Sequence, residues 1–341
     1  MTGSEATLSF SKLNLLRFTA AGMVALFHCG FLFNGHGDLP SYFIIGSDGV
    51  FIFFIISGFI IPWSMKQSHY QIRFFLSFLN KRFRRLYPPF FVSLIIYLVG
   101  FMIEHEGNIA TVLKTGFNHI LFLVPFGAGE WINQIYWTLF IELQFYILVG
   151  LIFPLLSNVN LSAQYWTILL LNSCTFLTFL IPQWTEKNFI FYHLPYFSIG
   201  FIIFLWFSSP KCRVHYLFFF LISLLTLTLN VHYLHKIGWS SIILSIITTI
   251  YILFFNTTNK FLEKLGEYSY SFYLFHGLII AWFIHLLDIP TTLSGKWMYV
   301  SGIFICSWII AAVGYWAIEK KSLLWSKKIK YPYAARITRS K

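Results

Sequence analysis

Long apolar stretches, divided by short polar loops, run along almost the whole chain. Each stretch has about the 20 residues that a helix needs to cross the hydrocarbon core of a bilayer. We therefore predict an all-α membrane protein with about ten transmembrane helices. The ten segments are 12–34, 49–65, 86–103, 137–156, 163–182, 188–207, 214–231, 239–256, 268–287 and 297–318.

One shorter apolar run needs a different interpretation. It covers 120–124 and ends at Pro125, inside the longest loop, 104–136. Because so few residues cannot cross a bilayer, we expect an interfacial or re-entrant piece there. The first long segment exceeds the apolar core of a signal peptide, and no small-residue cleavage site follows it, so we expect it to be retained.

The composition agrees with this pattern. The 341 residues are 57% hydrophobic and only 11% charged, and the mean hydropathy is +0.71. Ten spans would use about 200 residues, so no soluble catalytic domain fits in the remainder. We expect a membrane domain over 1–320 and a basic cytoplasmic tail over 321–341 that can touch anionic lipid. The four cysteines form neither a disulfide pattern nor a metal-ligand pattern.

The positive charges follow the predicted topology. A net charge of +12 would suggest a nucleic-acid partner in a soluble protein. Cytoplasmic loops of membrane proteins, however, carry an excess of Lys and Arg. We therefore predict that both termini are cytoplasmic, and we exclude nucleic acid as a partner. With this orientation all Lys and Arg residues lie on the inner side except Lys114, Lys187, Lys236 and Lys296.

Ionisable residues inside the predicted spans are few. Such residues are costly in a membrane, and for that reason they are candidates for functional sites. The sequence places Arg17 and His28 in the first span, Glu142 in the fourth, His193 in the sixth, His276 in the ninth and Glu319 at the end of the tenth.

Arg17 and His28 are eleven positions apart on one predicted helix. At about 100° per residue, eleven steps end within about 20° of three full turns, so both side chains face the same way. The helix rise separates them by about 16 Å, with Arg17 near the cytoplasmic end. One face thus offers a fixed cation and, deeper in the membrane, a titratable base. The alternative is that Arg17 extends to the inner interface and His28 is a packing residue.

Glu142 lies about 7 Å below the outer boundary of its span, a depth similar to that of His28. A carboxylate at that level could accept a hydrogen bond from the imidazole, fix its tautomer and raise its basicity. A structural pairing of Glu142 with another donor is the alternative.

Four cations lie within the five residues from Lys81 to Arg85, in the predicted inner loop before the third helix. Guanidinium groups bind phosphates through two parallel hydrogen bonds, so Arg82 and Arg85 could hold a phosphorylated ligand. Such clusters also serve simply to set membrane topology, and this signal alone does not separate the two roles.

Several motifs in this order resemble acyltransferase family 3, a family of membrane O-acyltransferases, over nearly the whole chain. Arg17 and His28 match a family motif in which ten residues separate an Arg from a His. The other matching segments are the apolar run 49–59 that ends in Ser57-Gly58-Phe59, the Arg82-x-x-Arg85 element followed by Tyr87-Pro88, the Trp-Thr-Leu-Phe-Ile-Glu-Leu-Gln-Phe-Tyr of 137–146, the segment 265–276 that ends in His276, and Ile318-Glu319-Lys320.

The chain departs from the family pattern at three places. Phe51 stands where the family often has Asp, although Asp48 lies just before it. Leu143 replaces a second Glu of the fourth-helix motif, and Lys321 stands where a Pro usually follows. These departures leave Asp48 and the end of the tenth helix without an expected role.

The resemblance implies a bacterial inner-membrane enzyme that takes an acyl group from cytosolic acyl-CoA, usually acetyl-CoA, without a permanently bound cofactor or metal. The acceptor would be a hydroxyl of an envelope sugar such as O-antigen or its lipid-linked precursor. Arg17, Arg82 and Arg85 would hold the CoA phosphates. Ser57 and Gly58 would let the pantetheine arm approach closely, although ordinary helix packing is the alternative for this pair.

The implied mechanism uses His28 as general base on the sugar hydroxyl, with Glu142 orienting the ring. An acyl-histidine intermediate is a variant of it. Tyr273, His276 and Trp137 are candidate pocket residues, and His276 could instead belong to a buried polar network. Many relatives carry an extra extracytoplasmic domain, and this sequence is expected to act as a stand-alone form.

A transporter or flippase of a lipid-linked sugar is the rival from another class, because such proteins also carry charges within the membrane. That fold favours two similar halves, and we find no convincing internal repeat. The transporter interpretation also gives no purpose to the shared face of Arg17 and His28. Saturable acyl-CoA binding would separate the two classes.

Overall fold

The computed structural model describes residues 11–33, 41–104, 108–157, 160–180, 188–234, 238–255 and 259–331. Over these ranges all regular secondary structure is helical, which confirms the predicted all-α class. The α-helices are α1 Ser11–Cys29, α2 Ser41–Ser47, α3 Gly49–Gln67, α4 Phe75–Glu104, α5 Ile109–Ile120, α6 Tyr136–Leu156, α7 Leu161–Cys174, α8 Leu177–Leu180, α9 Leu194–Ser208, α10 Arg213–Leu234, α11 Trp239–Phe254, α12 Lys260–Glu267, α13 Ser269–Leu286, α14 Leu293–Gly314 and α15 Lys320–Lys327.

Within the described ranges, eight helical segments are long and apolar enough to cross a membrane. Each overlaps one of the ten predicted spans, so the multi-pass architecture is confirmed. The eight segments are Lys12–Phe33, Phe43–Gln67, Ile72–Ile103, Tyr136–Leu156, Ile190–Ser208, Pro210–Tyr233, Ser269–Leu286 and Leu293–Lys327.

The two remaining predicted spans, 163–182 and 239–256, are helical but shorter than expected. The first is divided into α7 and α8 by a turn at Thr175 and Phe176. The second is α11, which has 16 residues and at about 1.5 Å per residue reaches about 24 Å, against about 30 Å for the hydrocarbon core.

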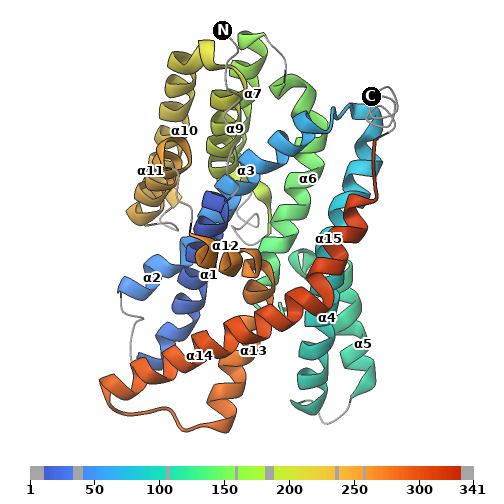
Figure 1. The fold of residues 1–341 in the computed structure, drawn as a ribbon, viewed down its shortest axis with the longest axis vertical. Coiled ribbons are helices and arrows are strands. Elements are labelled where there is room, and N and C mark those ends of the chain that lie inside the picture. The colour runs from blue at the N-terminus through green and yellow to red at the C-terminus, as the bar shows by residue number, and fades with distance from the viewer. Residues whose placement is uncertain are drawn as a thin grey trace.

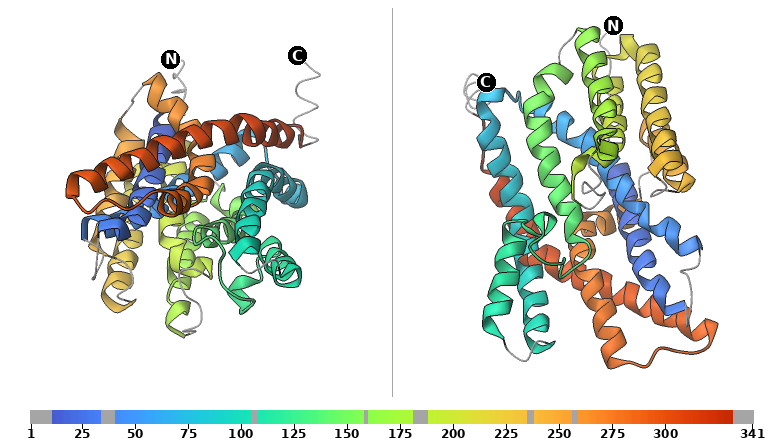
Figure 2. Two further views of the ribbon diagram at one scale, coloured as in Figure 1. Left: turned by 90° about the horizontal axis from the view of Figure 1, so that it is seen from below. Right: turned by 180° about the vertical axis from the view of Figure 1, so that it is seen from behind.

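Helices α1 and α3 cross the middle of the molecule (Figure 1). Helices α7, α9, α10 and α11 gather at one end of the long axis, and α5, α13 and the start of α14 at the other. Helices α4 and α6 run along this axis between the two ends, as the view from behind also shows (Figure 2). Because α1 and α3 contact each other and α1 also packs on α13, the central helices are placed to line a site between the two groups.

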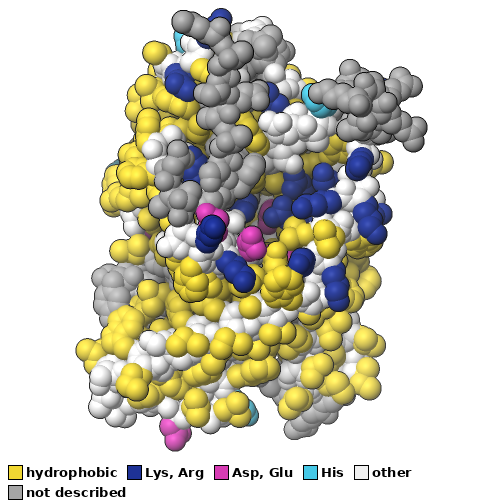
Figure 3. Space-filling model, viewed as in Figure 1, with side chains coloured by type: hydrophobic (Ala, Val, Ile, Leu, Met, Phe, Trp, Pro, Cys, Tyr) yellow, Lys and Arg dark blue, Asp and Glu magenta, His cyan; other side chains and the backbone are white. Residues whose placement is uncertain are grey.

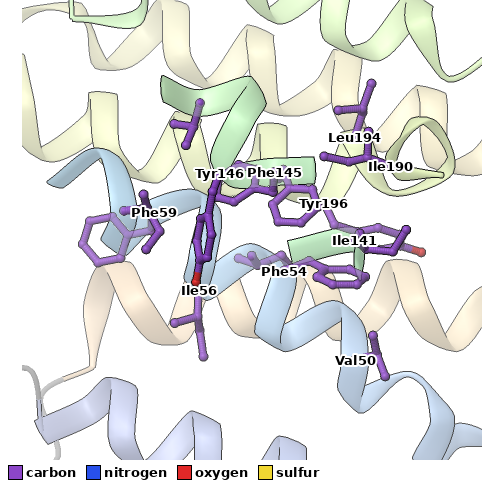
Figure 4. Packing of buried hydrophobic residues seen from close by; sticks show 14 of the residues in the cluster. Val50, Phe54, Ile56, Phe59, Ile141, Phe145, Tyr146, Ile190, Leu194 and Tyr196 are labelled. Carbon is purple, nitrogen blue, oxygen red and sulfur yellow. The ribbon is translucent and has the colours of Figure 1, made fainter. Parts of the chain in front are cut away.

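The main core forms where α3, α6 and α9 pack together, and Figure 4 shows part of it. Phe145 of α6 stacks on Phe197 of α9 with ring centroids 4.1 Å apart. Gly58 of α3 faces Gly200 of α9, and a Cβ on Gly58 would lie 2.4 Å from the Phe197 carbonyl oxygen. Small residues at such a crossing let two helices approach closely.

This crossing corrects the role expected for Gly58. We expected it to line the path of the pantetheine arm, but its missing side chain makes room for α9 instead. Ser57, the preceding residue, does line a cavity. Neighbouring residues on a helix point about 100° apart, and here Ser57 faces the cavity while Gly58 faces α9.

The basic cluster lies within a helix and not in a loop. Helix α4 begins at Phe75, before Lys81, and continues through Pro88 and Pro89. Its 30 residues therefore carry the cations on a rigid helical surface, where spacing decides which of them face the same way. The expected short piece near 120–124 is the turn that follows α5, a 12-residue helix that packs on α4, and it leads into the 3-10 helix Val124–Phe126.

The helical structure continues past residue 320, where we expected the membrane domain to end. A π-helical turn, Tyr315–Glu319, joins α14 to α15. Ser322 of α15 donates hydrogen bonds to the carbonyl oxygens of Arg84 and Arg85, at 2.5 and 2.8 Å. Tyr331 is buried and stacks on Phe74. The rest of the predicted tail, 332–341, lies outside the described residues, as does the start of the chain, 1–10.

Candidate active site

Two cavities meet in the middle of the molecule and share the lining residues Val50 and Tyr273. We call the first the arginine cavity. It has a volume of about 330 Å³ and is bounded by α1, α3, α4, α6, α12, α13 and the start of α15. Its ionisable lining residues are Arg17, Arg85, Glu142, Glu267 and Glu319.

The second, which we call the histidine cavity, has a volume of about 420 Å³. It is lined by residues of α1, α2, α3 and α13, the starts of α6 and α11, and the segment that precedes α9. Its lining combines a carboxylate, an amide, hydroxyls and aromatic rings. Among them are His28, Asp48, Gln134, Trp137 and Ser240.

Tyr273 stands between the two cavities in a fixed position. Its hydroxyl oxygen lies 3.0 Å from Oγ1 of Thr138. The Thr138 hydroxyl already donates to the carbonyl oxygen of Ile135, at 2.8 Å. Because a hydroxyl has one proton to donate, Tyr273 is the donor in the first bond. The bond ties α13 to α6 at the boundary of the cavities.

Arg17 reaches the arginine cavity, as its predicted functional role requires. Its Nη1 donates to Oδ1 of Asn14, one turn earlier on α1, at 3.3 Å. The guanidinium is attracted to both Glu142 and Glu319 and is repelled by Arg85. The cavity lining thus contains two guanidinium groups and three carboxyl groups, so it carries no excess of cationic side chains.

Each of two carboxylates in this cavity is held by a hydroxyl. Oε1 of Glu142 accepts a hydrogen bond from Tyr146, one turn further along α6. Oε2 of Glu319 accepts from Oγ of Ser271 at 2.6 Å and from its backbone N–H at 3.2 Å. Glu319 ends the π-helical turn, a type of helix distortion that recurs at functional sites.

The structure separates Arg85 from Arg82. Arg85 lines the arginine cavity. Arg82 is only 6% exposed, and its guanidinium lies over the rings of Phe78 and Tyr146, at 5.3 and 5.7 Å. It borders a small apolar slot of about 30 Å³ between α4 and α6. The expectation that both arginines contact one ligand is therefore corrected, because the cavity includes Arg85 alone of the two.

His28 and His276 face each other across α1 and α13. Nδ1 of His28 lies 3.1 Å from Nε2 of His276. His276 is fully buried, and its Nδ1 lies 2.8 Å from the carbonyl oxygen of Tyr273 and 3.3 Å from that of Phe272. His28 is half-buried and lines the histidine cavity. His276 therefore lies behind His28.

This arrangement corrects the expected pairing of His28 with Glu142. Glu142 lies in the arginine cavity and accepts from Tyr146, whereas His276 is the group that the structure sets against the His28 ring. Similar depth along two helices did not bring the two side chains to the same cavity.

Asp48 and Trp137 share the cavity of His28. The carboxylate of Asp48 accepts from the hydroxyl of Ser240 at 2.5 Å and is only 5% exposed. The indole of Trp137 stacks on His193 at a centroid distance of 5.6 Å. Trp137 was expected in a pocket, and the structure places it there. A place for Asp48 in the site was not expected, because the family pattern puts its Asp three positions later.

Lys and Arg side chains gather on the face that carries α4 and α15, next to acidic side chains (Figure 3). Leu323 of α15 and Glu267 of α12 line the arginine cavity, so these two helices border it. Arg84 lies over the ring of Trp325 at 4.5 Å, and Lys81 is within electrostatic reach of Lys327. The excess of positive charge thus lies beside the cavity.

Apolar helices surround two cavities, one lined by charged residues and one that includes His28. This arrangement defines an integral membrane protein with a buried site suited to group transfer. The chain belongs to acyltransferase family 3, whose profile, described as an acyltransferase domain, matches residues 10–317. A protein of Acidianus two-tailed virus, named as an acetyltransferase (ORF330), is 25% identical over 285 residues, which are 77% of this chain and 81% of the viral protein. No solved structure matches the chain at a significant level.

Proposed function

We propose that this protein transfers an acyl group, most simply acetyl, from cytosolic acyl-CoA to a hydroxyl of an envelope sugar, such as O-antigen or its lipid-linked precursor. The family and the acetyltransferase name of the viral relative support acyl transfer. The observation that carries the proposal is the pair of cavities that share Val50 and Tyr273. Two substrates can approach this boundary from different cavities, and the reacting atoms can meet there.

The donor takes the arginine cavity. Because the charged lining of this cavity includes carboxylates as well as Arg17 and Arg85, we place the phosphates of CoA near its rim, by Arg85, Lys81, Arg84 and the cations of α15. The uncharged pantetheine arm passes Ser57 and leads the thioester toward Val50. The rise of α1 between Arg17 and His28, about 16 Å, is a suitable length for that arm.

The acceptor takes the histidine cavity. Sugars are bound by aromatic faces and by polar groups that fix their hydroxyls, and Trp137, Asp48 and Gln134 supply both kinds of group. Asp48 is already oriented by Ser240. This division places the acceptor hydroxyl on the same side of the boundary as His28.

The reaction follows from this placement. His28 removes the proton of the acceptor hydroxyl as its oxygen attacks the thioester carbonyl. The C–S bond then breaks, the acyl group stays on the sugar oxygen, and the proton passes from His28 to the CoA sulfur. No group needs to be oxidised or reduced.

The proposed orientation is that of the positive-inside rule, in a bacterial cytoplasmic membrane with both termini inside. In this orientation Arg17 is at the cytoplasmic end of α1, on the side where acyl-CoA is made. The histidine cavity is then nearer the outer surface, where envelope sugars are found.

The test uses purified protein in lipid nanodiscs, radiolabelled acetyl-CoA and an envelope glycan fraction. We expect label on the glycan, a loss of about 100-fold or more in His28→Ala, and weaker donor binding in Arg17→Ala. The exposed residues His285 and Arg213 supply the matched controls His285→Ala and Arg213→Ala, which should behave like wild type. Full turnover by His28→Ala would contradict the base assignment, and lack of saturable acetyl-CoA binding would favour the transporter class.

A further inference from the structure

We infer that His276 is a positioning residue that fixes the proton of His28 on Nδ1, so that Nε2 is the nitrogen that acts as base. This inference rests on the proposed function for its chemical consequence, but the arrangement of protons can be tested without any turnover. It is carried by a row of three polar groups on α1 and α13: His28, His276 and the carbonyl of Tyr273.

The first step concerns Nδ1 of His276. This nitrogen lies 2.8 Å from the carbonyl oxygen of Tyr273 and 3.3 Å from that of Phe272. A carbonyl oxygen can only accept a hydrogen bond. Nδ1 of His276 therefore carries a proton and donates it to the Tyr273 carbonyl.

The second step concerns the charge of His276. Its side chain is fully buried, lies beside the ring of Phe272 at a centroid distance of 5.9 Å, and has backbone carbonyls and another imidazole as its polar contacts. An imidazolium in such surroundings is costly without an anionic partner. His276 is therefore neutral, and with its proton on Nδ1, its Nε2 is an acceptor.

The third step concerns His28. Its Nδ1 lies 3.1 Å from that acceptor, so the proton between the two rings belongs to His28. In a neutral imidazole only one nitrogen is protonated, and the hydrogen bond made by one nitrogen decides the state of the other. Nε2 of His28 is therefore the nitrogen with the basic lone pair.

The row also serves the charged state that the reaction creates. When Nε2 takes the proton of the acceptor hydroxyl, His28 becomes an imidazolium. Its Nδ1–H then makes a charge-assisted bond to Nε2 of His276, which is stronger than the neutral one. His276 thus holds the ring in place and favours the protonated base, without touching the reacting atoms.

The first experiment compares two substitutions at this position. His276→Phe keeps a flat ring but cannot accept from His28, so the His28 proton is free to move to Nε2. We expect kcat to fall about 100-fold with the KM for acetyl-CoA unchanged. In His276→Gln, Oε1 can accept from His28 while the amide donates to the Tyr273 carbonyl, so we expect at least a tenfold recovery over the Phe variant. Equal activity of the Gln and Phe variants, or wild-type activity of the Phe variant, would overturn the inference.

The second experiment observes the protons directly in the unmodified enzyme. Solid-state NMR of ¹⁵N-histidine-labelled protein, with His28 assigned by its loss in His28→Gln, distinguishes protonated from unprotonated ring nitrogens. We expect Nδ1 protonated and Nε2 unprotonated in His28 at neutral pH. A proton on Nε2 would overturn the inference even if His28→Ala is inactive. Turnover by His28→Ala would instead reject the base role and leave the NMR result standing.

Discussion

Tyr146 donates a hydrogen bond to Glu142 from one turn further along α6. The bond holds the carboxylate within the arginine cavity, where it also attracts Arg17. A carboxylate that stands alone on a span suggests a partner for a catalytic base. Here its neighbours belong to the half of the site that we assign to the donor.

Glu142→Gln therefore should change the binding of the donor and not the protonation of the catalytic base. Removal of a negative charge from a cavity that receives an anionic donor should lower the KM for acetyl-CoA about threefold. The acidic limb of the pH profile of kcat/KM, which reports the base of the free enzyme, should keep its midpoint. Tyr146→Phe serves as the companion variant, since it releases the carboxylate without removing its charge. A shift of that midpoint by a full pH unit in Glu142→Gln would restore the pairing with His28.

Arg85 and Arg82 should differ when each is replaced by Gln. Arg85→Gln removes a guanidinium from the cavity lining, and we expect the Kd of acetyl-CoA to rise about tenfold or more, as for a lost charged hydrogen bond. Arg82→Gln should leave the Kd unchanged and lower the melting temperature, because its guanidinium packs on Phe78 and Tyr146. Isothermal titration and thermal unfolding in nanodiscs measure the two effects. Equal losses of affinity would place both arginines on the ligand.

Val50→Phe should impair acyl transfer without weakening the binding of acetyl-CoA. A larger ring at the shared boundary blocks contact between the substrates while leaving the arginine cavity open at its other end. We expect the Kd of acetyl-CoA to stay within about twofold and kcat to fall about 100-fold. Val99→Phe is the control, because Val99 is 55% exposed on α4. Unchanged kcat in Val50→Phe would show that the acyl group does not pass this boundary.

Gly58→Ala should destabilise the fold, since the new methyl group would lie 2.4 Å from the carbonyl oxygen of Phe197. We expect a lower melting temperature, with a cost of about 1 to 3 kcal/mol for overpacking. Gly100→Ala is the matched control, because nothing lies within 4 Å of a Cβ at that position. A normal melting temperature combined with weaker acetyl-CoA binding in Gly58→Ala would return this residue to the donor path.

The loop before α6 should loosen as the pH falls. Nε2 of His119 accepts from the backbone N–H of Ile132 at 2.9 Å, and Nδ1 lies 2.8 Å from the carbonyl oxygen of Thr115. Burial holds the pKa of His119 below its ordinary value of 6.5. The stabilisation is therefore complete above pH 6.5 and is lost as the pH falls through the lower pKa of the packed state, because protonation of Nε2 breaks the bond to Ile132.

Hydrogen exchange of residues 121–135, corrected for intrinsic rates, measures this loss. Protection should decrease as the pH falls below about 6.5, and in His119→Gln the step should disappear. The exposed His285 provides the control variant His285→Gln, which should keep the step. A step that persists in His119→Gln would assign it to another group.

The sequence predicts the spans well and places Arg17 and His28 on one face of the first helix, because both depend on local periodicity. Length and hydropathy define a span, and the helical repeat places Arg17 and His28 on one face of α1. The same helical repeat also explains why some of the predicted roles were wrong. Gly58 faces α9 while its neighbour Ser57 lines the cavity, and the basic cluster needed a helix start at Phe75 before its faces could be assigned.

Contacts between distant helices could not be predicted in this way. His28 and His276 are 248 positions apart, and only the packing of α1 on α13 brings them together. Departure from the family pattern also misled the interpretation of Asp48 and Glu319, because each lines a cavity in this fold. A charged side chain in or next to an apolar helix was the better signal at both positions.

The shared boundary at Val50 and Tyr273 has an electrical consequence. If each cavity opens to one aqueous side in the proposed orientation, most of the transmembrane voltage would fall across these two side chains and not across the full hydrocarbon thickness of about 30 Å. Moving one elementary charge through 100 mV takes about 2.3 kcal/mol. An acyl group is uncharged, so in the proposed reaction it would cross this short, steep field without electrical work, while the phosphates of its carrier stayed on the cytoplasmic side.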